Sequence, residues 1–190
     1  IHTLKMHLSK RQGSIDGQLD YNANNKPLMT GQLQTNHFPI KQQSVSGKIY
    51  FSKQADNLKT SVDLSNDKTK DYMRGSLTHN KTWQAQWSTK IANWQRYTNH
   101  LNGALNSSGT FKNQLITTTG SATLSPLRYG NYNLGQLTAQ WAIDTREADA
   151  PSTITLKLHH LSYKTHRIRD ITIQTQGTLH QHTTQLNIAF

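Results

Sequence analysis

Ten carboxylates and ten histidines are the side chains of this chain that could carry out acid–base or metal chemistry. General acid–base catalysis needs at least two such groups with matched pKa values in one place. Nearly all the carboxylates fall instead at predicted turns or among the polar residues of predicted strands. The sequence also lacks a Gly-x-Ser-x-Gly elbow, a phosphate-cradling loop and a dinucleotide fingerprint. We therefore expect no catalytic residues and no enzyme.

Histidine spacing suggests one candidate metal site. His180 and His182 are two residues apart, so they share one face of a strand, and His159 or His160 could add a ligand for Zn²⁺ or Ni²⁺. No acidic residue accompanies this set, and the chain contains no cysteine. A polar strand face is the better interpretation, so we expect no metal and no cofactor.

Aromatic and basic residues suggest a second binding chemistry, the stacking of single-stranded nucleic acid on a charged surface. The formal net charge is +11 and the pI is about 10.0. The residues in question are Trp83, Trp87, Trp94 and Trp141, beside Lys81, Lys90, Arg96 and Arg146. The basic residues are scattered along the whole chain without a clustered run. Single-stranded nucleic-acid binding is therefore a remote alternative.

Strands are the elements that must position these side chains, because apolar and polar residues alternate from end to end. The clearest runs are Leu4, Met6, Leu8; Ile15, Gly17, Leu19, Tyr21; Leu58, Thr60, Val62, Leu64; Leu137, Ala139, Trp141, Ile143; and Ile154, Leu156, Leu158. Roughly a dozen antiparallel strands fit. Basic residues should lie on the polar parity, opposite each strand's apolar residues.

Turn residues separate the predicted strands. They cluster at 22–26, 36–39, 66–68, 80–81, 106–108 and 144–151, and the same pattern resumes after the last of these. We interpret 144–151 as a long loop within a single segment covering residues 1–190. Helical spacing also fits Trp83, Trp87, Ile91 and Trp94, but the alternation of a strand fits Trp83, Ala85 and Trp87 equally well. Only a short helical turn near 93–99 is expected.

The glycines follow a rule. The residue two places after a glycine is large and apolar for ten of the eleven glycines, and only Gly120, followed by Ala122, departs from it. Strand neighbours two apart point the same way, so these glycines lie on the apolar face. There they leave room for a sharp bend or for close approach of something lying on that face. We expect a strongly curved sheet with its apolar face inside.

Four phrases of the chain carry a resemblance to a known family. They are MRGSLTHNKTW (73–83), LNGALNSSGTF (101–111), SPLRYGNYNLGQLTAQW (125–141) and IRDITIQTQGTLHQHTTQLNI (168–188). In the last phrase, Ile171 and Ile173 precede Gly177 and Thr178, and His182 comes five residues after the glycine. With its phrases in this order, the chain resembles the periplasmic β-groove proteins of the AsmA-like and TamB type. The match is looser over 1–43.

The resemblance implies a long antiparallel sheet folded over into an open apolar trough, the β-taco. It implies a periplasmic protein, anchored to the inner membrane through a segment outside this chain, that carries phospholipid between the inner and outer membranes. The implied partners are phospholipid acyl chains and the outer-membrane barrel subunit of the translocation and assembly module. We take the chain to be an excerpt of a longer protein. A protein-docking scaffold for outer-membrane β-barrel or autotransporter assembly is the alternative.

The trough should stay partly unfilled, because only 33% of the residues are hydrophobic and the apolar positions are separated by Thr, Ala or Gly. Acyl chains would fill that space. The residues predicted to line this lipid-binding groove are Ile49, Leu77, Trp87, Leu105, Phe111, Leu137, Trp141, Leu156, Ile171, Ile173 and Leu179.

Overall fold

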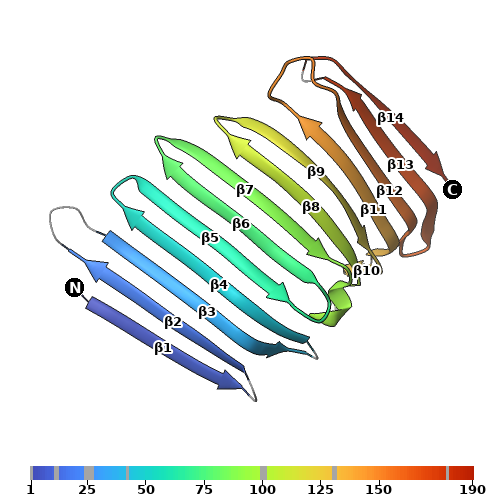
Figure 1. The fold of residues 1–190 in the computed structure, drawn as a ribbon. Helices are drawn as coiled ribbons and strands as arrows, with labels where there is room; N and C mark the ends of the chain where they lie inside the picture. Colours follow the sequence, from blue (N-terminus) through green and yellow to red (C-terminus); the bar gives the residue numbers. More distant parts are fainter. Residues whose placement is uncertain are drawn as a thin grey trace. The chain divides into compact units, whose positions relative to one another are not determined.

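A computed structural model describes residues 2–10, 13–23, 28–41, 43–98, 102–129, 132–178 and 180–190 (Figure 1). The strands are β1 (His2–Lys10), β2 (Gly13–Asn22), β3 (Leu28–Ile40), β4 (Gln43–Gln54), β5 (Asn57–Asn66), β6 (Asp71–Asn80), β7 (Thr82–Ile91), β8 (Gly103–Lys112), β9 (Leu115–Leu124), β10 (Leu127–Tyr129), β11 (Tyr132–Asp144), β12 (Ser152–Tyr163), β13 (His166–Gly177) and β14 (His182–Ala189). The one helical element among the described residues is the 3₁₀ turn η1 (Trp94–Arg96). In this part of the chain no helix has the length and apolarity to cross a membrane.

The strand order follows the order of the chain, except that β10 pairs only with β11, and every pairing that the structure records is antiparallel. Chain contacts define two units. The first comprises Ile1–Lys90 and Thr110–Gln114, and the second comprises Ile91–Gly109 and Leu115–Phe190. The predicted all-β antiparallel architecture is confirmed. The expected strong curvature is wrong, because neither unit closes on itself or is strongly curled. The folding of the sheet into a trough stays a prediction.

Two segments whose sequence pattern is ambiguous have the structure that the sequence analysis predicts. Trp83 and Trp87 lie on strand β7, and the only helical structure nearby is η1, inside the expected 93–99. Asn93 begins that turn because its side-chain Oδ1 accepts a hydrogen bond from the Gln95 backbone N–H at 2.8 Å. The acidic stretch after Asp144 is a loop between β11 and β12, as predicted.

Two predicted turns are wrong. Residues 36–39 lie inside β3, where the pairing with β4 shifts between Thr35 and Phe38 and His37 has a φ of 48°. This β-bulge absorbs the turn-forming residues without ending the strand. Residues 106–108 lie inside β8, where the Ser108 carbonyl oxygen accepts a hydrogen bond from Thr118 Oγ1 at 3.1 Å. In both segments, pairing with the neighbouring strand outweighs local turn propensity.

Apolar side chains lie on one face of the sheet in each unit, and they are poorly covered. Ile91, 7% exposed, is the only hydrophobic residue among the described ones that counts as buried. Leu4, Leu186 and Phe190 are 67%, 58% and 85% exposed. A sheet with a second layer packed on it would bury such residues. Each unit is therefore a single layer whose apolar face is open.

Glycines lie on this apolar face beneath large side chains of the next strand. Gly31 pairs with Phe51, and a Cβ added at Gly31 would lie 2.6 Å from the Phe51 ring. Gly120 pairs with Trp141, and a Cβ there would lie 2.3 Å from the indole. The predicted location is thus confirmed for Gly31, and Gly120 lies on the apolar face of its unit although it departs from the sequence rule. Their role here is to admit an aromatic ring, and this also explains Gly120, the exception to the sequence rule.

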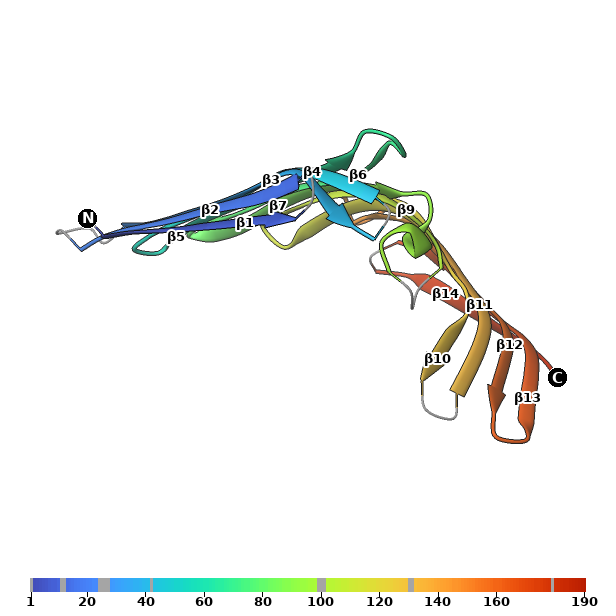
Figure 2. The same cartoon turned by 90° about the horizontal axis from the view of Figure 1, so that it is seen from below.

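A kink crosses three strands of the second unit. The pairing of β11, β12 and β13 is interrupted at Gly135, His160 and Arg169, and His160 has a φ of 56°. Large apolar residues change sequence parity there, from Leu158 on one side to Leu161 on the other. Figure 2 shows β11, β12 and β13 bending along their length. These three strands thus bend where the pairing between them is locally interrupted.

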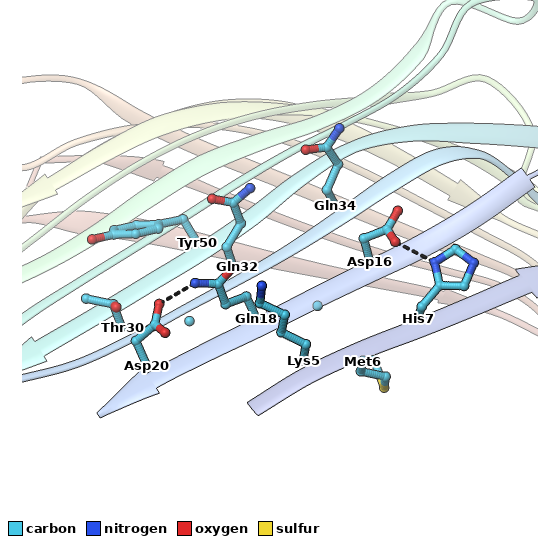
Figure 3. Close-up of a pocket in the computed structure, with 12 residues that line it drawn as sticks. Lys5, Met6, His7, Asp16, Gln18, Asp20, Thr30, Gln32, Gln34 and Tyr50 are labelled. Carbon is cyan, nitrogen blue, oxygen red and sulfur yellow. Dashed lines mark hydrogen bonds and ion pairs between the residues drawn. The ribbon is translucent and has the colours of Figure 1, made fainter. Parts of the chain in front are cut away.

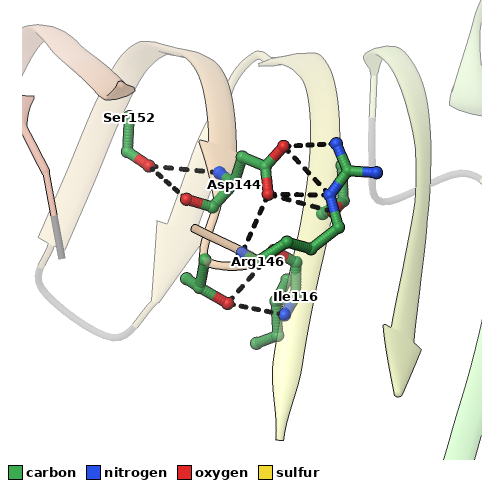
Figure 4. A network of polar contacts seen from close by, with 6 residues as sticks. Ile116, Asp144, Arg146 and Ser152 are labelled. Carbon is green, nitrogen blue, oxygen red and sulfur yellow. Dashed lines mark hydrogen bonds and ion pairs between the residues drawn. The ribbon is translucent and has the colours of Figure 1, made fainter. Parts of the chain in front are cut away.

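The loop after β11 is fixed by charge-assisted and neutral hydrogen bonds (Figure 4). Arg146 donates from Nε and Nη2 to the Asp144 carboxylate, and its backbone N–H donates to Asp144 Oδ1 at 3.0 Å. Thr145 Oγ1 accepts from the Ile116 backbone N–H at 2.7 Å, which ties the loop to β9. Chiefly because Arg146 donates these bonds, the pKa of Asp144 falls from 3.8 to about 2.

Replacing Gly120 by alanine should lower the free energy of unfolding by about 1–3 kcal/mol, because the new methyl group overpacks against the Trp141 ring and the Asn106 carbonyl oxygen. Urea denaturation measures this change. The control is Ser121→Ala at an exposed neighbouring position, which should stay within about 0.5 kcal/mol of the unsubstituted chain. Equal stability of the two variants would contradict the described nesting of Trp141 on Gly120.

Replacing Arg146 by alanine should raise the pKa of Asp144 toward 3.8, because its side-chain donors are lost while the backbone N–H donor remains. In the unsubstituted chain the stabilisation from this pair is complete above pH 3.8 and is lost as the pH falls through about 2. Carboxyl chemical shifts followed through an acid titration measure the pKa. An unchanged value in the variant would contradict the assigned cause, and Lys157→Ala should leave it unchanged.

Candidate functional site

The apolar face of the first unit is built from rows of directly paired residues that run across strands β1 to β7. Paired residues point to the same face of an antiparallel sheet, so each row stays on one side. The first row is Met6, Gly17, Leu33, Ile49, Val62, Gly75 and Trp87. The second row is Leu4, Leu19, Gly31, Phe51, Thr60, Leu77 and Ala85. At about 4.8 Å per strand, each row is about 29 Å long.

A shallow groove of about 280 Å³ lies on these rows between β1 and β4. Gly17 and Gly31, which have no side chains, lie among its lining residues and leave it room. The larger residues around it are Leu4, Met6, Leu19, Leu33, Ile49 and Phe51. The groove is therefore an apolar depression whose lining residues come from four neighbouring strands.

The second unit presents three further rows, which cross β9, β11, β12, β13 and β14. They are Gly120, Trp141, Ile154, Thr175, Thr184; Ala122, Ala139, Leu156, Ile173, Leu186; and Leu124, Leu137, Leu158, Ile171, Ile188. Trp141 contacts Gly120, and its Nε1–H donates to Thr118 Oγ1 at 3.1 Å. Its polar atom is thereby satisfied, and its ring is available as apolar surface.

Most of the predicted groove residues lie on these rows. In the first unit they are Ile49, Leu77 and Trp87; in the second they are Leu137, Trp141, Leu156, Ile171 and Ile173. Leu105 and Phe111 share one side of β8 by strand alternation. Leu179 lies outside the described residues. Gln136 and Thr155 lie on the opposite, polar face from Leu137 and Leu156.

Sequence reasoning missed five of the residues that surround the 280 Å³ groove. They are Leu4, Met6, Leu19, Leu33 and Phe51. The available signal was the spacing of Gly17 with Leu19 and of Gly31 with Leu33. What the sequence could not show was that pairing brings Phe51 over Gly31 and Met6 over Gly17.

Two carboxylates of the polar face, Asp16 and Asp20, are held by hydrogen bonds (Figure 3). In a polar pocket of about 490 Å³ on the first unit, Asp16 pairs with His7 Nδ1 at 2.5 Å and Asp20 accepts from Thr3 Oγ1 at 2.7 Å. Hydrogen bonds from His7 and from Thr3 are the main reasons why the pKa values of Asp16 and Asp20 lie below 3.8. Both carboxylates are thus ionised at neutral pH and cannot serve as general acids there.

The structure separates several of the histidine and tryptophan candidates. His180 precedes β14, so it does not share a strand face with His182 as predicted. His159 lies on the polar face with its Nδ1 2.6 Å from Asp170 Oδ1, whereas His182 pairs with Gly177 on the apolar face. These two histidines therefore cannot ligate one metal ion. Trp87 likewise lies on the apolar face of β7, while Lys90 lies on its polar face. The aromatic ring and the positive charge that a nucleic-acid stacking platform would combine therefore lie on opposite faces of β7.

Comparison with known proteins identifies a family. A family model described as "TamB, N-terminal domain" matches residues 2–189, a span that runs from β1 to β14 and includes both units. No curated protein and no solved structure matches the chain.

The open apolar face should bind the fluorescent dye 1-anilinonaphthalene-8-sulfonate while the chain is folded, because no described segment covers residues such as Leu4. Leu4→Gln should weaken the fluorescence enhancement, since it removes apolar surface beside the groove at little cost in stability. Lys5→Gln changes the opposite face and is the matched control. Dye fluorescence that appears only on unfolding would contradict an exposed apolar face.

Proposed function

The chain belongs to the TamB family, and we propose that its apolar face holds the acyl chains of phospholipids that move between the inner and outer membranes. Membership implies a periplasmic protein with a role in outer-membrane biogenesis as part of the translocation and assembly module, whose partner subunit is TamA. The family is one of transport and assembly proteins, not of enzymes.

The observation that carries the proposal is the continuity of the apolar rows together with the absence of a cover over them among the described residues. Met73 on β6 and Ile154 on β12 are 40% and 41% exposed. Apolar area removed from water contributes about 25 cal/mol per Å². A face of this kind is therefore a favourable surface for an apolar ligand, and its rows run in one direction across the strands.

The shape of the face supports acyl chains as that ligand. Glycines open a groove of about 280 Å³ between larger residues, and an acyl chain is narrow enough to lie along a row. We propose that the sheet folds over around such chains and forms a trough. The proposed lining is the set Ile49, Leu77, Trp87, Leu105, Phe111, Leu137, Trp141, Leu156, Ile171, Ile173 and Leu179.

The polar face favours the same arrangement. Lys5, Lys48, Lys59 and Lys157 lie on it, opposite the apolar rows, as the alternation predicted. Lys53 is an exception on the apolar parity, next to the end of β4. A charge placed in mid-row would cost several kcal/mol when covered by hydrocarbon, so this partition keeps the path free of charge.

A docking scaffold for outer-membrane barrel clients is the second candidate. Its support is the same exposed apolar surface, which the apolar side chains of an extended client segment could also cover. In this arrangement the captured molecule would be a polypeptide.

Leu156→Arg should block lipid photo-crosslinking at positions beyond residue 156 while the chain still folds. The arginine places an unpaired charge in the middle of a row, and acyl chains could pass it only at a cost of several kcal/mol. Photo-reactive residues introduced at groove positions in the full-length protein, followed by mass analysis of the captured molecules, measure the effect.

Thr155→Arg is the matched control, because it adds the same charge at a half-buried position on the polar face. It should leave lipid crosslinking unchanged. Equal lipid capture by both variants would remove the conduit function. Capture of polypeptide in place of lipid would favour the docking scaffold.

A further inference from the structure

The outer ends of β11, β12 and β13, beyond the kink, form a distinct surface that the apolar rows do not include. We name the residues from Leu161 to Ile168, with the paired segment Tyr132–Leu134, the β12–β13 tip. Figure 2 shows the β12–β13 hairpin beside the β10–β11 hairpin, consistent with the pairing of β11 with β12. The tip lies wholly within the second unit.

Two tyrosines dominate the tip. Tyr132 and Tyr163 are directly paired, and their rings stack with centroids 4.5 Å apart and planes inclined by 25°. They are 51% and 36% exposed. Stacking holds both rings in place, and their exposure leaves apolar ring surface and hydroxyl groups in contact with solvent.

Two basic residues lie near this tyrosine pair. Lys164 Nζ lies 5.3 Å from the Tyr163 ring centroid, and Arg167 lies opposite Ser162; both are exposed. The acid nearest in sequence, Asp170, already pairs with His159 and with Arg169. Lys164 and Arg167 form no ion pair with a described residue, so the tip carries uncompensated positive charge.

An apolar row lies behind the charges. Leu134, Leu161 and Ile168 pair directly across the three strands and are half-buried. Tyrosine beside lysine and arginine, next to apolar side chains, is the combination found at membrane interfaces: aromatic rings sit at headgroup level and basic groups attract anionic lipid.

We propose that the β12–β13 tip docks on the surface of a bilayer that contains anionic phospholipid, with Lys164 and Arg167 against the phosphate groups. The inference deepens the proposed function, on which it rests for lipid as the cargo. Stacked rings and basic residues also suit single-stranded nucleic acid. The periplasmic location of the family and the apolar row favour a membrane.

The test compares binding of the chain to vesicles of phosphatidylcholine alone with binding to vesicles that also contain phosphatidylglycerol, by flotation. The unsubstituted chain should float only with the anionic vesicles. The double variant Lys164→Gln, Arg167→Gln should bind them about thirtyfold more weakly, because each basic residue near an anionic surface contributes about 1 kcal/mol. Tyr132→Ser should also weaken binding.

The control variant Lys48→Gln, Lys59→Gln removes the same charge from exposed positions on the polar face of the first unit and should bind as the unsubstituted chain does. Equal weakening by both double variants would overturn the proposal, since net charge alone would then explain binding. Equal flotation with both kinds of vesicle, or tighter binding to a single-stranded oligonucleotide than to the anionic vesicles, would also overturn it.

Crosslinking of lipid at groove positions separates this inference from the proposed function. If the tip variant loses vesicle binding but keeps acyl-chain crosslinking, both the tip and the conduit are supported as separate sites. If vesicle binding depends on the tip while no position of the groove captures lipid, the conduit fails and the membrane-docking tip stands.

Discussion

Lateral pairing between strands is the interaction on which everything else in this chain depends. The structure gives each unit one layer, so main-chain donors and acceptors find partners in the neighbouring strands, not in a second layer or in a core. Hydrophobic burial, the usual main source of stability, is reduced to contacts between side chains in adjacent strands. The nesting of Phe51 on Gly31 and of Trp141 on Gly120 shows how the sheet obtains such contacts.

Because each unit has a single layer, its polar and apolar faces carry different chemical groups. On the polar face, Asp16 pairs with His7, Asp20 accepts a hydrogen bond from Thr3, and Asp170 pairs with His159 and Arg169. The apolar face keeps its exposed rows free of such groups over most of its area. A chain arranged in this way can offer a surface along which an apolar molecule lies.

Alternation in the sequence predicted most of the strands, because side chains on a pleated sheet repeat every two residues whatever the sheet packs against. It also placed Leu137, Leu156 and Ile171 on one face. It failed where the main chain departs from the pleat: the bulge at His37 absorbed residues that elsewhere would turn the chain. The kink at His160 exchanges the parity of the apolar residues. Contacts between strands, such as those that form the groove, depend on which residues pair with one another. The sequence of a single strand does not determine that pairing.

The pairing of glycine with a large side chain has a consequence for strand register. A slip of one residue would turn apolar side chains to the polar face, but a slip of two would leave every residue on its own face. Polar positions filled by Thr, Gln and Asn would tolerate such a slip. It would, however, move Phe51 from Gly31 to Leu33 or Met29, and Trp141 from Gly120 to Thr118 or Ala122. The glycines therefore act as register marks, which a long sheet of near-identical strands needs if each strand is to find its own position.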